Sequence, residues 1–211
     1  MISMMAFIMR CCTSRRDVLR VLFAALLLWV GVAAAHAGSI AVGKAELRLD
    51  GESYQAVADF VVTPNSVVEQ ALTHGVPLYF TSEFTLIRHR WYWLNEVVVQ
   101  DEQTVRLSYN ALTRQYRINY GTLFQNFSSL DDALQTLGHL VFASFQASSL
   151  KPGIRYVASV RMYLDLTQLP KPLQINAIVN TDWGLDTDWY RWSVGADMAR
   201  DDTKSNIWDF N

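Results

Sequence analysis

The chain has no cysteine after its first twelve residues, which restricts both its redox chemistry and its metal chemistry. Its two cysteines are Cys11 and Cys12, within an N-terminal segment that we expect to be removed. The rest of the chain has no thiol, so disulfides and thiolate metal sites are excluded there. A chain of about 150 residues buries nearly 70% of its unfolded surface, so the 174 residues after position 37 can form a core without such crosslinks.

The chain also lacks the short motifs of common hydrolases. It contains neither the G-x-S-x-G nucleophile elbow nor the H-E-x-x-H pair of zinc proteases. The histidines beyond residue 37 are widely separated and have no acidic residue at ligand spacing; they are His74, His89 and His139. We interpret them as surface or helix-end residues.

The densest acidic cluster consists of Asp182, Asp186 and Asp188. Oxygen ligands suit Ca²⁺, but the D-x-D-x-D-G core of a calcium loop is missing here. Solvated turn aspartates are the better interpretation. We therefore expect no catalytic residue, no metal-binding residue and no cofactor.

Positive charge is scarce in the part of the chain that we expect to function. The first 37 residues hold four arginines and one aspartate, so their removal changes the formal net charge from −2 to about −5. The remaining charges are interspersed and form no basic block. This pattern argues against binding to nucleic acid or to an anionic membrane surface.

The N-terminal segment has the three-part layout of a secretory signal peptide. Four arginines precede an apolar run, residues 21–35, and small residues Ala35 and Ala37 stand at positions −3 and −1 of a predicted cut after Ala37. A spanning helix needs roughly 20 apolar residues, so this run of fifteen favours cleavage over retention as an anchor. We expect a periplasmic protein, with an inner-membrane anchor as the alternative.

The export route stays open between general secretion and the twin-arginine pathway. Residues 14–20 are similar to a twin-arginine signal, although Val18 stands where Phe is usual. Beyond the signal segment 1–37, we predict a single globular domain over 38–198 and a polar C-terminal tail over 199–211. No linker or internal repeat interrupts the domain.

Period-two alternation of apolar and polar residues dominates the domain and predicts antiparallel strands. The predicted strands lie near residues 44–50, 54–62, 78–86, 105–109, 116–120, 156–166 and 189–194. A hairpin is expected at Asp50-Gly51, a second one turning at 110–114, and a bulge near Leu86, where the apolar phase slips toward Trp91 and Trp93.

Two segments have helical spacing instead. Ser66 and Glu69 form a candidate capping box, and Ser129 opens a second helix expected to reach Val141. The segment 169–177 is a candidate third helix, which Pro170 and Pro172 limit to a short turn. The fold class predicted is α+β and mostly antiparallel β, a sheet or sandwich of about eight strands with two or three short helices at one face or end.

Several ordered motifs over roughly residues 45–194 resemble the bacterial exported family called domain of unknown function 4390. They are residues 71–80 (ALTHGVPLYF), 130–134 (LDDAL), 150–153 (LKPG), 169–173 (LPKPL) with Asn176-Ala177, and Asp182-Trp183 followed by Trp189. The resemblance implies a signal-bearing protein without an assigned activity, and it assigns no functional residue. Some members are described as proline-rich, but this chain has only five prolines.

Aromatic residues concentrate beside arginine in two clusters, the first over residues 88–93 and the second over residues 183–192, which suggests a binding surface. The candidate partner-binding residues are Arg88, Arg90, Trp91, Trp93, Trp189 and Arg191. Exposed Trp and Arg are typical of interfaces. Alternate residues of a strand fill the core, so at most half of each cluster can be displayed.

These observations favour a non-enzymatic periplasmic or cell-envelope module that binds an unknown envelope protein or polymer. We expect no binding to nucleic acid, and contact with the membrane only through the N-terminal segment, during export or if that segment stays uncleaved. One alternative is an envelope hydrolase whose carboxylates, or a carboxylate with His139 or His89, are brought together by the fold. Another is a membrane-anchored accessory subunit with an uncleaved N-terminus.

Overall fold

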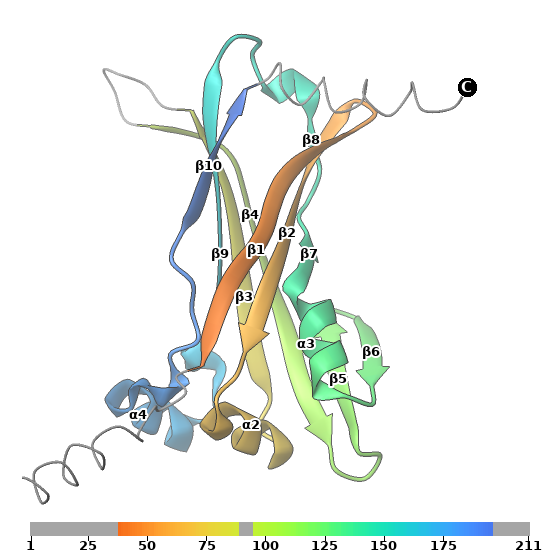
Figure 1. Cartoon of the computed structure of the whole chain (residues 1–211), viewed down its shortest axis with the longest axis vertical. Helices are drawn as coiled ribbons and strands as arrows, with labels where there is room; N and C mark the ends of the chain where they lie inside the picture. Colours follow the sequence, from red (N-terminus) through yellow and green to blue (C-terminus); the bar gives the residue numbers. More distant parts are fainter. Residues whose placement is uncertain (1–37, 89–94, 196–211) are drawn as a thin grey trace, which may run out of the picture. The chain divides into compact units, whose positions relative to one another are not determined.

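The computed structural model describes residues 38–88 and 95–195, which form a sandwich of two antiparallel sheets (Figure 1). Its strands are β1 (Ser39–Asp50), β2 (Ser53–Thr63), β3 (Leu78–Arg88), β4 (Glu96–Asn110), β5 (Gln115–Tyr120), β6 (Leu123–Phe127), β7 (His139–Val141), β8 (Phe145–Gln146), β9 (Arg155–Leu164) and β10 (Tyr190–Gly195). Its helices are α2 (Ser66–Thr73), α3 (Leu130–Gly138) and α4 (Lys171–Val179), with short 3₁₀ turns η1 (Ala147–Ser149), η2 (Leu166–Gln168) and η3 (Thr181–Trp183). The predicted fold class is confirmed.

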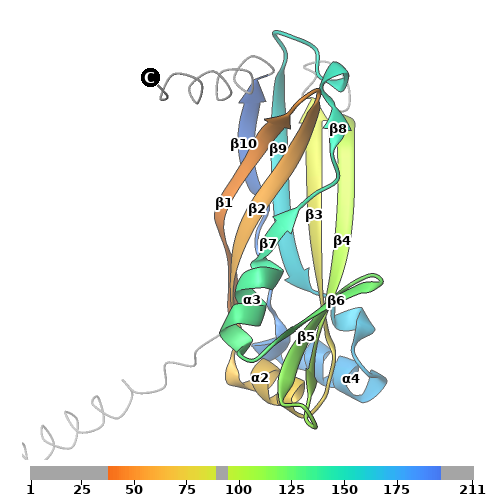
Figure 2. The same ribbon diagram turned by 90° about the vertical axis from the view of Figure 1, so that its right-hand side faces the viewer.

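The two sheets differ in size and in how their strands are joined. The smaller sheet has the order β1-β2-β7, with β8 also pairing with β2. The larger sheet has the order β10-β9-β3-β4-β5-β6, so β3 and β9 are neighbours although they are far apart in sequence. Figure 2 shows β1 and β2 in one layer beside a second layer that contains β3 and β4, with α2 and α4 at one end of the strands.

Local turn chemistry explains the hairpins that the sequence predicts. β1 and β2 pair along their whole length and are joined through Gly51, whose φ of 60° is left-handed and suits glycine. β4 and β5 turn within residues 111–114, as predicted. The predicted bulge in β3 is also confirmed, since the pairing with β4 shifts between Leu86 and Ile87.

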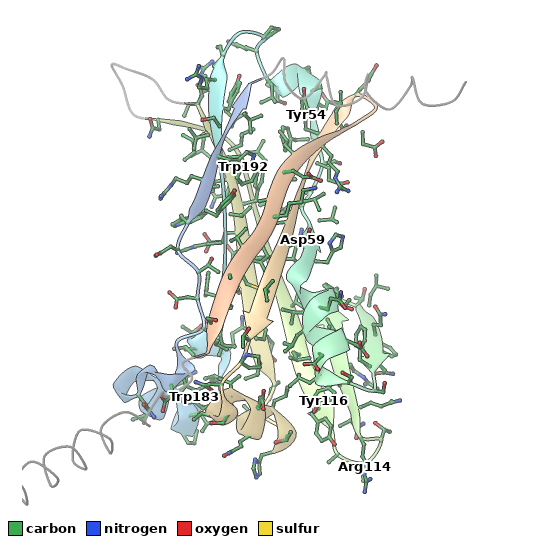
Figure 3. The ribbon with its side chains drawn as sticks, viewed as in Figure 1. Tyr54, Asp59, Arg114, Tyr116, Trp183 and Trp192 are labelled. Atoms are coloured by element: carbon green, nitrogen blue, oxygen red, sulfur yellow. The ribbon has the colours of Figure 1, made fainter. Side chains whose placement is uncertain are left out.

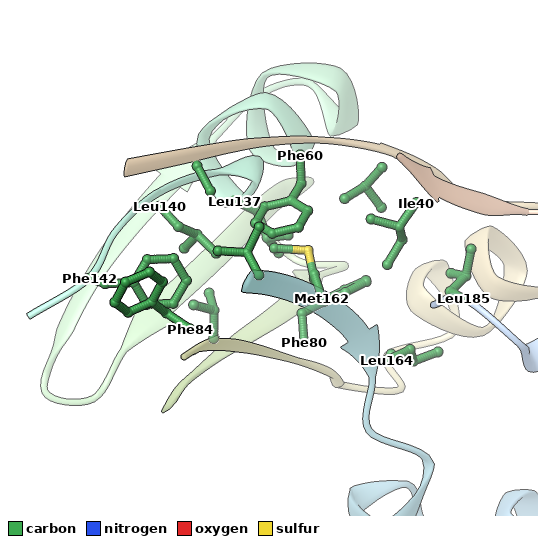
Figure 4. Packing of buried hydrophobic residues seen from close by; sticks show 14 of the residues in the cluster. Ile40, Phe60, Phe80, Phe84, Leu137, Leu140, Phe142, Met162, Leu164 and Leu185 are labelled. Atoms are coloured by element: carbon green, nitrogen blue, oxygen red, sulfur yellow. The ribbon is translucent and has the colours of Figure 1, made fainter. Parts of the chain in front are cut away.

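The core lies between the sheets and is built from alternate residues of their inner faces (Figure 4). Phe80, Phe84 and Met162 of the larger sheet meet Phe60 and Leu140 of the smaller one. Each is nearly or fully buried, and burial of such a side chain contributes about 1.5–3 kcal/mol. This packing holds the sheets together without crosslinks.

Two helix boundaries differ from the predicted ones. The N-cap of α2 is Asn65, not Ser66: the Asn65 side chain accepts a hydrogen bond from the Val68 amide at 3.0 Å and donates to the Asp182 carbonyl at 2.5 Å. Asn65 is therefore the N-cap residue, because its side chain satisfies an amide at the start of the helix and also binds a carbonyl that is distant in sequence. Ser129 caps α3 as predicted, but α3 ends at Gly138, so placing Val141 in a helix was wrong.

The candidate third helix at residues 169–177 is confirmed as α4, although its nine residues make it longer than the short turn predicted from the prolines. Pro172 lies in its first turn, where a backbone N–H would have no partner within the helix, so proline is tolerated there. The β9 strand ends at Leu164, and Leu166 belongs to η2 instead of the strand.

No helix in the two described ranges combines the length and the apolar character needed to cross a membrane.

The end of α3 crosses β2 so closely that only glycine fits there. A Cβ added at Gly138 would lie 2.0 Å from the carbonyl oxygen of Phe60. We predict that Gly138→Ala lowers the free energy of unfolding by roughly 3 kcal/mol, because backbone must move to admit the methyl group. Gly43→Ala is the control, since its nearest atom is 3.4 Å away; equal losses in urea unfolding of the two variants would contradict the argument.

Candidate binding surface

The first predicted aromatic cluster is only partly described by the structure. Arg88 ends β3 and forms an ion pair with Glu96, and its side chain is only 15% exposed. Arg90, Trp91 and Trp93 lie outside the described residues, as do Ala35 and Ala37 of the predicted cleavage site. Of this cluster, the structure therefore describes a single arginine that is already paired.

The second cluster is divided by the fold. Trp183 is buried in η3, whereas Trp192 lies in β10, toward the other end of the sheet (Figure 3). Along β10, Trp192 packs against the core, and Arg191 is exposed on the outer face. Trp189, just before β10, is half-buried. Trp189 and Arg191 therefore lie on the face of the strand opposite to Trp192.

A row of side chains crosses the outer face of the larger sheet from β10 to β4. Trp189 lies beside Arg161, Arg161 pairs with Glu83, and Glu83 stands opposite Glu102 in the strand register. The Arg161 guanidinium carbon lies 4.6 Å from the centre of the Trp189 ring and 5.0 Å from that of Tyr163. A cation so placed over aromatic rings is held in a defined orientation.

Glu83 holds this row together by accepting two hydrogen bonds on one oxygen. Arg161 Nη2 donates to Glu83 Oε1 at 2.7 Å, and the Tyr163 hydroxyl donates to the same atom at 3.1 Å. The hydrogen bond to Glu83 raises the pKa of Arg161, which keeps the guanidinium charged. Burial, followed by the contact with Glu83, raises the pKa of Tyr163, which keeps the hydroxyl a donor. Arg161 Nε is buried without an acceptor in the described chain.

A further arginine on the same face also lies over an aromatic ring. The Arg106 guanidinium carbon of β4 is 5.9 Å from the Tyr79 ring of β3, its partner in the register. We call this surface the arginine–aromatic face; its residues are Tyr79, Arg106, Arg161, Tyr163, Trp189 and Arg191.

Sequence reasoning found Trp189 and Arg191 but missed the other members of the arginine–aromatic face. Arg161 and Tyr163 alternate with buried residues of β9, so their outward position was readable from the alternation. Their partner Glu83 is 78 residues away from Arg161, and no local pattern connects the two.

A different group of polar side chains lies on the outer face of the smaller sheet. His139, the first residue of β7, places Nδ1 2.5 Å from Asp59 Oδ1 of β2. Two hollows, of about 470 Å³ and about 230 Å³, both include His139 and Gln135 in their walls. The fold therefore brings together a carboxylate and one of the histidines considered for an enzyme.

This pair is open to solvent. The side chains are 58% exposed for His139 and 48% for Asp59. Preorganised electrostatic catalysis depends on a site that excludes water, and these exposed groups have no such enclosure.

Another hollow of about 470 Å³ lies at the β1–β2 turn. Its walls include Glu52, Tyr54 and Ser148. Within residues 38–88 and 95–195, no group of three or more His, Cys, Asp or Glu side chains is arranged to hold a metal ion.

The Arg161–Glu83 pair can be tested through stability. We predict that Arg161→Met destabilises the domain by about 1 kcal/mol, because Glu83 is only 15% exposed and loses a charged donor. The value is small because Arg161 is itself a third exposed to water. Arg191→Met is the matched control, since Arg191 is exposed and has no hydrogen bond or ion pair in the described chain. Urea unfolding measures both; an unchanged Arg161→Met variant would show that the pair contributes nothing.

Comparison with known families gives one match. A family described as a domain of unknown function (DUF4390) matches residues 37–193, most of the chain. No curated protein and no solved structure shows significant similarity.

Proposed function

Because the chain belongs to the DUF4390 family, whose description assigns no activity, we propose its function from its own surfaces. The protein is an exported, non-enzymatic binding module of the cell envelope. It binds a partner protein or an envelope polymer on its arginine–aromatic face.

The observation that carries this proposal is the contact of the Arg161 guanidinium with two aromatic rings and with Glu83. The guanidinium is stacked on Tyr163 and Trp189 and bonded to Glu83 before any ligand arrives. Aromatic residues and arginine dominate the energy of interfaces, and side chains that are already ordered lose less entropy on binding. Arg106 and Arg191 are exposed on the same face and extend the surface with further hydrogen-bond donors.

Location in the envelope is supported by the N-terminal segment. Its basic, apolar and small-residue regions are typical of a signal peptide, and the domain that follows has no thiol that oxidation could change. The alternative is that the same segment stays attached and anchors an accessory subunit in the inner membrane.

Mass spectrometry of the exported protein tests the location. We predict that fractionation of a bacterial host yields a periplasmic form beginning at Gly38. Ala37→Glu should accumulate the precursor, because a bulky charged residue replaces the small one required next to the cut. An intact N-terminus at residue 1 in the stable form would instead support the anchored subunit.

Affinity capture with mild crosslinking tests the binding face. We predict that Trp189→Ala with Arg191→Glu reduces recovery of the bound envelope component about tenfold or more, because an aromatic anchor is lost and a charge is reversed. The matched control is Lys44→Ala with Arg48→Glu, on β1 of the other sheet. If recovery of the component falls equally in both double variants, or is unchanged in both, the arginine–aromatic face is not the binding site.

A second candidate function is hydrolysis of envelope material, favoured by the contact between His139 and Asp59. A carboxylate that accepts from Nδ1 of a histidine leaves Nε2 able to accept a proton from water. We predict that any hydrolysis of isolated envelope polysaccharide is lost in both His139→Gln and Asp59→Asn, while His74→Gln keeps it. Activity that survives both substitutions would exclude this pair.

A further inference from the structure

We propose that the free edge of β6 receives an extended segment of a partner protein, which carries acidic side chains and adds as a seventh strand to the larger sheet. The site is separate from the arginine–aromatic face and does not depend on it. It lies at the opposite edge of the sheet from β10.

β6 presents an unused row of backbone groups. All five of its residues pair with β5 on one side, from Leu123 opposite Tyr120 to Phe127 opposite Tyr116. Within the described chain, no backbone group of β6 forms a hydrogen bond beyond β5. The amide and carbonyl groups that point away from β5 can therefore pair with an incoming strand, which is the basis of recognition by strand addition.

The other sheet edges in the described chain carry features that disfavour such pairing. β10, at the far edge of the larger sheet, carries the exposed charge of Arg191. β1 has alternating charges at Lys44, Glu46 and Arg48 and a bulge between Val42 and Lys44. β7 and β8 are only three and two residues long. β6 contains no charged residue, no proline and no glycine, so its edge has none of the residues that usually protect an edge strand from pairing.

Apolar side chains on both faces of β6 are exposed. Leu123 is 73% exposed and Phe124 is 61% exposed. Neighbouring residues of a strand point to opposite faces, so alternate side chains of one added strand would cover both of them.

The outer side of this edge is ordered before binding. The Arg117 guanidinium carbon lies 4.8 Å from the centre of the Phe124 ring, and Arg117 Nε donates to Asn126 Oδ1 at 2.9 Å. Arg117 still has further donors, since a guanidinium carries five N–H groups. It can therefore bind a carboxylate from a strand alongside β6.

The positive charge beside β6 favours a partner segment with acidic side chains. Residues 111–127 contain Arg114 and Arg117 and no acidic residue, although the chain beyond residue 37 has a net charge of about −5. Arg114 lies at the tip of the β4–β5 turn (Figure 3). The nearby Asp131 and Asp132 belong to the first turn of α3, where they complement the helix dipole.

The same charges disfavour a second copy of this chain as the occupant. Pairing of β6 with β6 of another copy would bring two hairpins of like charge together. An acidic partner segment gains from Arg114 and Arg117, whereas a second copy brings the same arginines and no acidic group in this hairpin.

Selection from a random ten-residue peptide library, displayed on phage, tests the proposal with the purified exported protein as bait. We expect the enriched peptides to alternate β-branched or apolar residues with Asp or Glu. A capped synthetic version of the most enriched peptide should slow hydrogen exchange of the amides of residues 123–127. Its affinity should fall about tenfold or more in Arg117→Glu, because a favourable charge pair becomes repulsive.

Matched variants keep the test independent of folding. Arg114→Glu changes only the exposed tip and should weaken the same peptide to a smaller degree. Arg48→Glu, on the protected edge strand β1, and Trp189→Ala, on the arginine–aromatic face, should both leave its affinity unchanged.

Three kinds of result would overturn the proposal. The first concerns the selection: either no peptide is enriched, or the enriched peptides are basic. Another is protection at β1 or β10 with none at β6. The third is a concentration-dependent dimer that protects residues 123–127 without peptide, since β6 would then be occupied by a second copy.

Discussion

The pairing of β3 with β9 is the contact on which the rest of the structure depends. β3 lies between β9 and β4 in the larger sheet, and its inner residues Phe80 and Phe84 are among the most buried side chains. Slipping the register by one residue would turn these rings outward and expose the core. Burial of one face therefore also determines which residues appear on the other face, including Glu83 opposite Arg161.

The outer face of the larger sheet follows from this register. Arg161 and Glu83 meet because their strands are neighbours, and Trp189 joins them because β10 pairs with β9 immediately after it. Part of the aromatic density in the sequence belongs to the core, as Trp183 and Trp192 show. The arginine–aromatic face displays a smaller set, in which Tyr79 and Trp189 each contact an arginine of a neighbouring strand. Tyr163 contacts Arg161 of its own strand.

Local patterns predicted those features whose causes are local. The hairpin at Gly51, the bulge at Leu86 and the Ser129 cap each depend on a few adjacent residues. The errors lie at places where the chain contacts residues that are distant in sequence. Asn65 caps α2 while it binds the carbonyl of Asp182, and α3 ends at Gly138, where the backbone of Phe60 passes close by. The short strands β7 and β8 carry too few residues for a periodic signal.

The sequence by itself determined the export-like segment, the absence of thiols, the antiparallel strands and the placement of Trp189 and Arg191 on one face of their strand. Only the tertiary structure decided that this face is the outer one, that Arg161 contacts both Tyr163 and Trp189, that His139 meets Asp59, and that β6 is left at an unprotected edge. The physical reason is that period-two alternation defines the faces of a strand but not its neighbours. Which strands become neighbours depends on the register that buries the whole core at once.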